Sequence, residues 1–204
     1  MAQRIAEIRR AEIVEACMRT IESVGVALPV YDKIATEADM SRQLVRHYFP
    51  DPEDLMVAVC DALAGEYKRL LAEGILAAKS TERLDLFLDF YFGVVTSTGH
   101  AKPADDTVYD AMMALAATHP RVKKNLTEGY GLLRLTVAHE IQISHGDLPQ
   151  RACEELAHLF VALMYGHWKM AASLDVSPDM NLAARDAMTR LITSYVDHYE
   201  PTGE

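Results

Sequence analysis

Apolar positions along this chain recur at steps of three to five residues, which is the spacing of one face of an α-helix. In the first 24 residues the recurring positions are Ile5, Ile8, Ile13, Cys17, Ile21 and Val24. Residues that favour helices (Ala, Leu, Met, Glu and Arg) are abundant, and runs of alternating β-branched residues, which would indicate strands, are lacking. The pattern predicts an all-α protein.

Glycine, proline and capping residues divide this pattern into nine predicted helices. We expect helices over residues 2–24, 31–38, 41–48, 52–79, 81–98, 104–118, 120–146, 150–174 and 179–199. Ser41 is a candidate N-cap, and Pro52 with the two acids after it suits a first helical turn. Gly25 and Gly99 are expected to end the first and fifth helices. The sequence therefore predicts three compact helices in residues 1–51 and a larger bundle in residues 52–204, connected by the fourth helix.

The 204 residues carry a net charge of -10, and half of them are apolar, which is enough for a sizeable core. This acidity excludes proteins that coat nucleic acids or membrane surfaces through broad basic patches. The charge is uneven, because residues 1–49 hold seven basic and seven acidic side chains, whereas the remaining residues hold 13 and 23. We therefore expect any DNA contact to come from a narrow face of the neutral N-terminal part.

Residues 1–10 are polar and charged, unlike a signal peptide, and no apolar run approaches the roughly 20 residues that a membrane span requires. The three cysteines, Cys17, Cys60 and Cys153, are too scattered for a disulfide framework or a CxxC metal pair. We expect them to be reduced and buried. These features predict a soluble, cytoplasmic protein.

Residues 34–49 contain two short predicted helices joined by a tight turn. The outer side of the second helix carries Arg42, Gln43, Arg46 and His47, and residues 41–48 include no Asp or Glu. Such side chains suit contacts with base edges and phosphates. The arrangement predicts a helix-turn-helix with the second helix as its recognition helix. The alternative is any helical hairpin whose outer face is basic.

Residues 9–63 resemble the DNA-binding domain of the TetR family of one-component transcriptional regulators. The resemblance rests on Arg10, Ile13, Ala16, Gly25, Ile34, Ala35, Ala38, Ser41, His47, Tyr48, Phe49 and Leu55. The triplet at residues 47–49, followed by a turn and Leu55 in a new helix, is the most specific of these features. In the C-terminal part, residues 162–168 look like helix eight of the BetI-like subgroup.

The resemblance implies a ligand-responsive regulator, most often a repressor, that binds a palindromic DNA operator as a homodimer. Its two recognition helices would enter successive major grooves about 34–36 Å apart. A small molecule in the C-terminal bundle would release or modulate it by tilting the fourth helix. Residues 1–51 would be the DNA-binding domain and residues 52–204 the ligand-binding and dimerisation domain. The DNA-binding residues implied are Lys33, Ser41, Arg42, Gln43, Arg46, His47 and Tyr48.

The chain differs from the family at positions that commonly contact the phosphates of DNA. Pro29 and Val30 stand where the second helix usually begins with Thr or Ser, and Pro52 stands where a Lys commonly contacts the DNA backbone. Asp39 replaces the usual glycine of the turn, but it tolerates the left-handed conformation. We expect these changes to weaken the phosphate contacts, and Arg46 to read a guanine.

A ligand pocket needs an apolar lining with a few polar groups. The candidates are Phe87, Tyr91, Tyr109, Met113, Phe160, Met164 and Trp168. The alternative at each of these positions is plain core packing. BetI-like relatives sense small cationic metabolites, and an aromatic cage could hold a quaternary ammonium. The sequence itself leaves the ligand unidentified.

The last two predicted helices carry apolar stripes at helical spacing. In the family these helices pair with those of a second subunit as a four-helix bundle, and Ala162 and Gly166 would permit close approach. The alternative is that both stripes cover the chain's own core. The stripes consist of Leu156, Phe160, Met164, Trp168, Met188, Leu191, Ile192, Tyr195 and Tyr199.

Signatures of catalysis are weak in this chain. Glu155 and His158 form an ExxH pair, but no second pair completes a di-iron site, so we expect a surface carboxylate and a semi-buried histidine. The GxSxG, P-loop, GxGxxG and HExxH motifs are absent. We therefore expect no catalytic residue, metal or cofactor. The alternative function is a helical binding or scaffold protein of the same fold, with weak or lost DNA binding.

Overall fold

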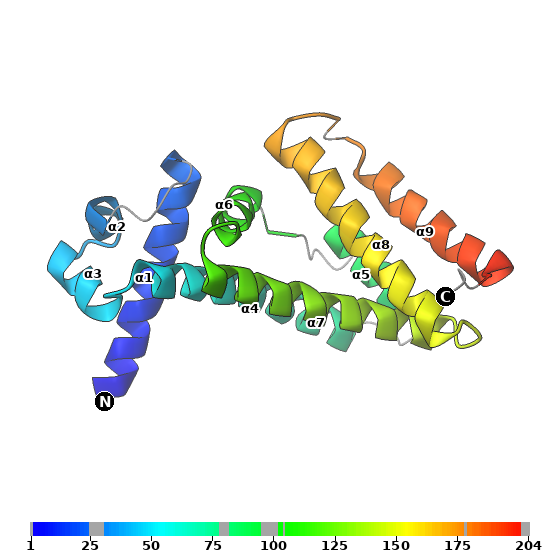
Figure 1. The fold of residues 1–204 in the computed structure, drawn as a ribbon, viewed down its shortest axis with the longest axis horizontal. Coiled ribbons are helices and arrows are strands. Elements are labelled where there is room, and N and C mark those ends of the chain that lie inside the picture. The colour runs from blue at the N-terminus through cyan, green and yellow to red at the C-terminus, as the bar shows by residue number, and fades with distance from the viewer. Residues whose placement is uncertain are drawn as a thin grey trace. The chain divides into compact units, whose positions relative to one another are not determined.

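The computed structural model describes residues 2–24, 31–77, 82–94, 102–103, 105–177 and 179–200. Within these residues the structure is helical and contains no strand (Figure 1), which confirms the all-α prediction. The helices are α1 (Ala2–Val24), α2 (Tyr31–Glu37), α3 (Arg42–Tyr48), α4 (Pro52–Ala77), α5 (Arg83–Tyr91), α6 (Asp106–Ala116), α7 (Pro120–Ser144), α8 (Gln150–Trp168) and α9 (Asn181–His198). A π-helical turn, Lys169–Ser173, continues α8. The predictions for Gly25, Pro29, Val30 and Gly99 lie outside the described residues.

The fifth helix is much shorter than the sequence predicts. It ends at Tyr91 and not near residue 98, because Gly93 adopts a φ of 67° and turns the chain. A Cβ atom at Gly93 would lie 2.7 Å from Cη2 of Trp168, so a side chain at this position would clash. The other predicted boundaries, apart from the end of the eighth helix, differ from the observed ones by two residues at most.

The chain divides into two compact units. Unit 1 comprises Met1–Glu66 and Asp105–Glu128, and unit 2 comprises Tyr67–Ala104 and Gly129–Glu204. Helices α4 and α7 are continuous and contribute residues to both units. Among the described helices, none combines the length and the apolar character that crossing a membrane would need.

In unit 1, α1 packs against α2, α3 and α6, and α2 packs against α3 (Figure 1). The buried side chains include Ile13, Ala16, Cys17, Ile34, Val45, Phe49, Leu55 and Val59. Ile5, Ile8 and Val24, which the pattern assigned to the buried face of α1, are exposed. Burial is confined to the middle of α1, and its first turns extend beyond α2 and α3.

The cysteines are buried and free, as the sequence predicted. Burial raises the pKa of Cys17 and of Cys60 to about 12, so both thiols stay protonated and unreactive near neutral pH. Cys153 donates a hydrogen bond to Oε1 of Gln142, 3.4 Å away, and joins the end of α7 to the start of α8. All three side chains therefore act as core residues.

In unit 2, α9 packs against α8 and α5, and aromatic rings fill the space between helices. Tyr91 lies at the centre of this cluster. The centroid of its ring is 5.2 Å from that of Phe90, 5.6 Å from that of Phe160 and 5.9 Å from that of Tyr67. Since these rings belong to α5, α8 and α4, the aromatic cluster joins three helices.

Candidate functional site

The helix-turn-helix geometry follows from two local features. Ser41 is the N-cap of α3, and its Oγ accepts a hydrogen bond of 3.1 Å from the backbone N–H of Leu44. Asp39 adopts a φ of 50°, the left-handed conformation that the tight turn requires. Both features were predicted from the sequence. Val45 and Phe49 are completely buried beneath α3, so the opposite side of the helix faces outward.

The residues predicted to contact DNA belong to α3 or its N-cap, except for Lys33, which belongs to α2. Six of the seven are exposed and Tyr48 is half-buried. The exposed residues are Lys33, Ser41, Arg42, Gln43, Arg46 and His47. We call the side of α3 that carries Ser41, Arg42, Gln43, Arg46 and His47 the α3 face; Lys33 lies on the neighbouring helix α2.

Two arginines of the α3 face already have neighbours on α2. Nη1 of Arg42 lies 3.1 Å from Oδ2 of Asp32, and Cζ of Arg46 lies 5.5 Å from the centroid of the Tyr31 ring. An exposed ion pair such as that of Arg42 contributes only about 0–1 kcal/mol. Arg42 can therefore exchange its carboxylate partner for a phosphate at little cost.

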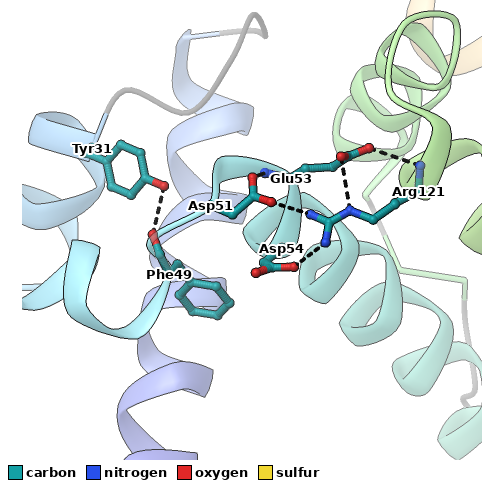
Figure 2. Close-up of polar contacts among 6 residues, drawn as sticks. All are labelled: Tyr31, Phe49, Asp51, Glu53, Asp54 and Arg121. Atoms are coloured by element: carbon teal, nitrogen blue, oxygen red, sulfur yellow. Dashed lines mark hydrogen bonds and ion pairs between the residues drawn. The ribbon is translucent and has the colours of Figure 1, made fainter.

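The end of α3 is held by two side chains that the sequence analysis did not place in this role. Nη1 of Arg10 donates a hydrogen bond of 2.6 Å to the carbonyl of Tyr48, and its Cζ lies 4.0 Å from the centroid of the Phe49 ring. The Tyr31 hydroxyl donates to the carbonyl of Phe49 over 2.9 Å (Figure 2). Burial raises the pKa of Tyr31, so the phenol remains a donor. For Arg10, the family resemblance was the only feature of the sequence that indicated a role.

A second group of polar contacts holds the start of α4. Arg121, on the first turn of α7, lies among three carboxylates that follow α3 in the chain (Figure 2). Its Nη2 is 2.8 Å from Asp51, its Nε is 3.0 Å from Glu53 and its Nη1 is 2.7 Å from Asp54. The backbone N–H of Arg121 also donates to Glu53 over 3.0 Å. We call these four residues the Arg121 cluster.

The Arg121 cluster concentrates three carboxylates directly after α3 in the chain. Burial alone would raise the pKa of Glu53, but hydrogen bonds from the backbone and side chain of Arg121 lower it overall. Asp51 accepts a further hydrogen bond of 2.9 Å from the backbone N–H of Glu53 and so occupies the N-terminus of α4. Three carboxylates on either side of Pro52 thus surround one guanidinium. Arg121 was missed because its partners lie far away in the sequence.

The candidate ligand-binding residues fall into two groups. Phe87, Tyr91, Phe160 and Met164 are buried in unit 2, and Trp168 is half-buried there. Ring contacts join Tyr91 to Phe87 at 6.2 Å and to Phe160 at 5.6 Å. The other group consists of Tyr109 and Met113, which are half-buried on α6 in unit 1.

Trp168 has neighbours on several sides. Its Nε1–H donates a hydrogen bond of 2.7 Å to the carbonyl of Tyr91, and the indole packs against Gly93. The ammonium of Lys102 lies 4.3 Å from the centroid of the ring, a distance at which a cation is attracted by the aromatic face. The indole is therefore a structural contact between α8 and the turn after α5, and it also has a face that accepts a cation.

The stripes on α8 and α9 mostly cover the core of unit 2. Leu156, Phe160, Met164, Met188 and Ile192 are buried within the single chain, which is the alternative that the sequence left open for them. The remaining members, Trp168, Leu191, Tyr195 and Tyr199, are half-buried. On the opposite side of α8, Ala162 and Gly166 are exposed.

Glu155 and His158 do not form a metal site. Glu155 accepts hydrogen bonds from Arg151 at 3.2 Å, Tyr199 at 3.4 Å and Tyr195 at 3.5 Å. His158 is exposed, not semi-buried as expected, because it lies on the outer side of α8. No cluster of three or more His, Cys, Asp or Glu residues in the described part of the chain could hold a metal ion.

Comparison with curated proteins finds regulators of transcription, although no family model matches the chain. The HTH-type transcriptional regulator BetI of Paraburkholderia phytofirmans is 31% identical over 80 residues. That match covers 39% of this chain and 41% of the relative, so it spans less than half of the relative's length. BetI of Cronobacter sakazakii is 27% identical over 196 residues, which cover 91% of this chain and 89% of the relative.

Solved structures share the fold at lower identity. A TetR transcription regulator from Haloarcula marismortui superposes with a TM-score of 0.75 at 20% identity, covering 92% of this chain and 98% of that one. A transcriptional regulator from Saccharomonospora viridis, solved in complex with choline, gives a TM-score of 0.67 at 19% identity, covering 93% and 95%. The chain is therefore similar in sequence to HTH-type transcriptional regulators named BetI, and it shares the fold of solved TetR-family regulators.

Proposed function

We propose that the protein is a ligand-responsive repressor that binds a palindromic DNA operator as a homodimer. The observation that carries this proposal is the α3 face, where exposed Arg42, Gln43 and Arg46 lie on a capped helix after a left-handed turn. In this role Arg46 forms the bidentate pair with a guanine, and Ser41 and Lys33 contact phosphates. Tyr48 and His47 complete the contact at the end of the helix.

The dimer in this proposal forms through the outer sides of α8 and α9. Ala162 and Gly166 are exposed there and small enough for helices of two subunits to approach closely. Two recognition helices then bind half-sites about 34–36 Å apart, one turn of the duplex. Residues 1–51 serve as the DNA-binding domain and residues 52–204 as the effector and dimerisation domain, in a cytoplasmic protein.

The proposed effector is a small organic cation. The Trp168 ring attracts the Lys102 ammonium at 4.3 Å, and an organic cation can replace this ammonium on the same aromatic face. The choline complex of the Saccharomonospora protein, which shares this fold, supports the same chemistry. Effector binding changes the affinity of the protein for DNA only if the effector prefers one of the two conformations of the protein.

A second function, a helical binding protein with weak DNA affinity, is favoured by one observation. Asp51, Glu53 and Asp54 place three carboxylates directly after α3 in the chain, and Arg121 pairs with all three. Such a field opposes the approach of a phosphate backbone. The two functions therefore differ in the DNA affinity that they predict.

The test is selection of genomic DNA fragments by the full-length protein at low salt, with and without choline as the probe. A repressor enriches a palindrome whose affinity falls steeply with salt, whereas a scaffold protein enriches no sequence. Arg46→Ala should then abolish operator binding without lowering thermal stability noticeably, because the side chain is exposed. Arg134→Ala, which removes an exposed arginine of α7, is the control and should bind normally. If Arg46→Ala unfolds the protein, the assignment of the α3 face is wrong.

A further inference from the structure

The Arg121 cluster joins two segments that are remote in the sequence but belong to the same unit. Arg121 uses all three guanidinium nitrogens and its backbone N–H toward α4, and each nitrogen of the guanidinium has a different carboxylate partner. Only the planar fork of an arginine can make these contacts at once, since a lysine is a single point charge. The cluster therefore fixes the orientation of the first turn of α4 relative to the first turn of α7.

This first turn of α4 directly follows the recognition helix. Asp51 is two residues after Phe49, whose carbonyl accepts from Tyr31 and whose ring lies 4.0 Å from Cζ of Arg10. Residues 49–54 are thus held at one end by Arg10 of α1 and Tyr31 of α2, and at the other by Arg121 of α7; Figure 2 shows the contacts of Tyr31 and Arg121. A displacement of the first turn of α7 would be passed through the Arg121 cluster to the end of α3.

We propose that Arg121 is a positioning residue for DNA binding, which sets the orientation of α3 from α7. The inference rests on the proposed function, because it assumes DNA binding by α3. It also assigns Arg121 to the pathway that couples effector binding to α3. Helix α7 runs unbroken from Pro120 to Ser144, and its residues from Gly129 onward belong to the unit that holds Trp168. A change that an effector produces along α7 then reaches the start of α4, and so the end of α3, through the Arg121 cluster.

Two simpler roles of the Arg121 cluster predict different effects of mutation. If the cluster only stabilises the protein, removing Arg121 should loosen the whole of unit 1. If the cluster only sets a local charge, removing carboxylates should tighten DNA binding and removing Arg121 should weaken it. If Arg121 positions α3, removing either side of the cluster should weaken DNA binding, and removing both should add no further loss.

The first measurement needs no DNA and no effector. Hydrogen exchange of full-length Arg121→Gln should become faster in residues 42–56 and stay unchanged in α1 and unit 2. Arg121→Lys should show the same local change, since its charge is kept but the fork is lost. Lys124→Gln is the matched control, because Lys124 lies one turn further on α7 and pairs with the exposed Glu128 at 3.9 Å, not with the start of α4. Unchanged exchange in residues 42–56, or an increase throughout unit 1 including α1, would overturn the proposal.

The second measurement uses the operator obtained by fragment selection. Arg121→Gln should bind it about fivefold or more weakly, in the range of ordinary coupling between sites. The triple variant Asp51→Asn, Glu53→Gln, Asp54→Asn should lose affinity to a similar extent, and tighter binding by this variant would overturn the proposal. If the unchanged protein selects no operator, the proposed function fails, while the exchange experiment still decides whether Arg121 positions α3.

Discussion

Gly93 is the position where the structure makes the sharpest prediction about stability. Its φ of 67° ends α5, and a Cβ atom there would lie 2.7 Å from Cη2 of Trp168 and 2.9 Å from both Cζ2 of Trp168 and Nδ2 of Asn181. Gly93→Ala therefore imposes two separate costs. The alanine must adopt the left-handed conformation, and the indole and the amide must move away.

The size of the effect follows from these costs. An L-residue in the left-handed region costs about 1–2 kcal/mol. Overpacking against a ring that has little room to move adds about 1–3 kcal/mol. A shift of the indole also endangers its 2.7 Å hydrogen bond to Tyr91, and such bonds contribute about 1 kcal/mol. We expect Gly93→Ala to lower the free energy of unfolding by about 3–4 kcal/mol.

Denaturant unfolding followed by tryptophan fluorescence measures this loss directly, because Trp168 is the one tryptophan of the chain. The emission maximum of folded Gly93→Ala should also shift, since the indole has moved. Gly131→Ala is the matched control in α7 of the same unit, where an added Cβ meets nothing within 4 Å. It should stabilise the protein by about 0.5–1 kcal/mol. A loss below about 0.5 kcal/mol for Gly93→Ala, with unchanged emission, would refute the reasoning.

Two further predictions concern charged groups. Arg185 of α9 is only 17% exposed and donates hydrogen bonds to Asp85 at 2.6 Å and Asp89 at 2.9 Å on α5. Arg185→Ala should lower the free energy of unfolding by about 1.5–3 kcal/mol in denaturant titrations. The control Arg190→Ala, at an exposed position, should change it little. Equal losses in the two variants would contradict a stabilising role for the contact between α5 and α9. The second prediction concerns pH. The pKa of Glu53 is lowered from its ordinary value of 4.5, so ionised Glu53 stabilises unit 1. This stabilisation is fully present above pH 4.5 and is lost as the pH falls further. Melting temperatures of the unchanged protein and Glu53→Gln should differ above pH 4.5 and converge below it, and a constant difference would show that Glu53 does not act through its charge.

Much of the candidate DNA interface could be predicted because its determinants are local. The cap at Ser41 and the left-handed turn at Asp39 depend on contacts within a few residues, and both were confirmed. The exposure of Arg42 and Arg46 follows from helical periodicity once Val45 is buried. The contacts that hold the end of α3 depend on α1 and α2, so the pattern of α3 alone could not show them.

The C-terminal part was less predictable because the same pattern serves several arrangements. An apolar stripe on α8 is compatible with its own core or with a second subunit, and burial of Leu156, Phe160 and Met164 assigns those positions to the core. Aromatic candidates on α6 and α8 look alike in sequence, yet Tyr109 belongs to unit 1 and Trp168 to unit 2. Periodicity states which side of a helix is apolar, but not what covers it.

The sequence by itself determined the helical class, most helix boundaries and the basic outer side of α3, since these depend on interactions between residues at most four positions apart. Only the tertiary structure decided where α5 ends and what holds the start of α4. The end of α5 depends on an indole from α8 that leaves room for glycine alone at position 93. The start of α4 depends on Arg121, which reaches its three carboxylates only after the chain has folded. Contacts of this kind produce no periodic pattern in the sequence, because each partner by itself looks like an ordinary surface or core residue.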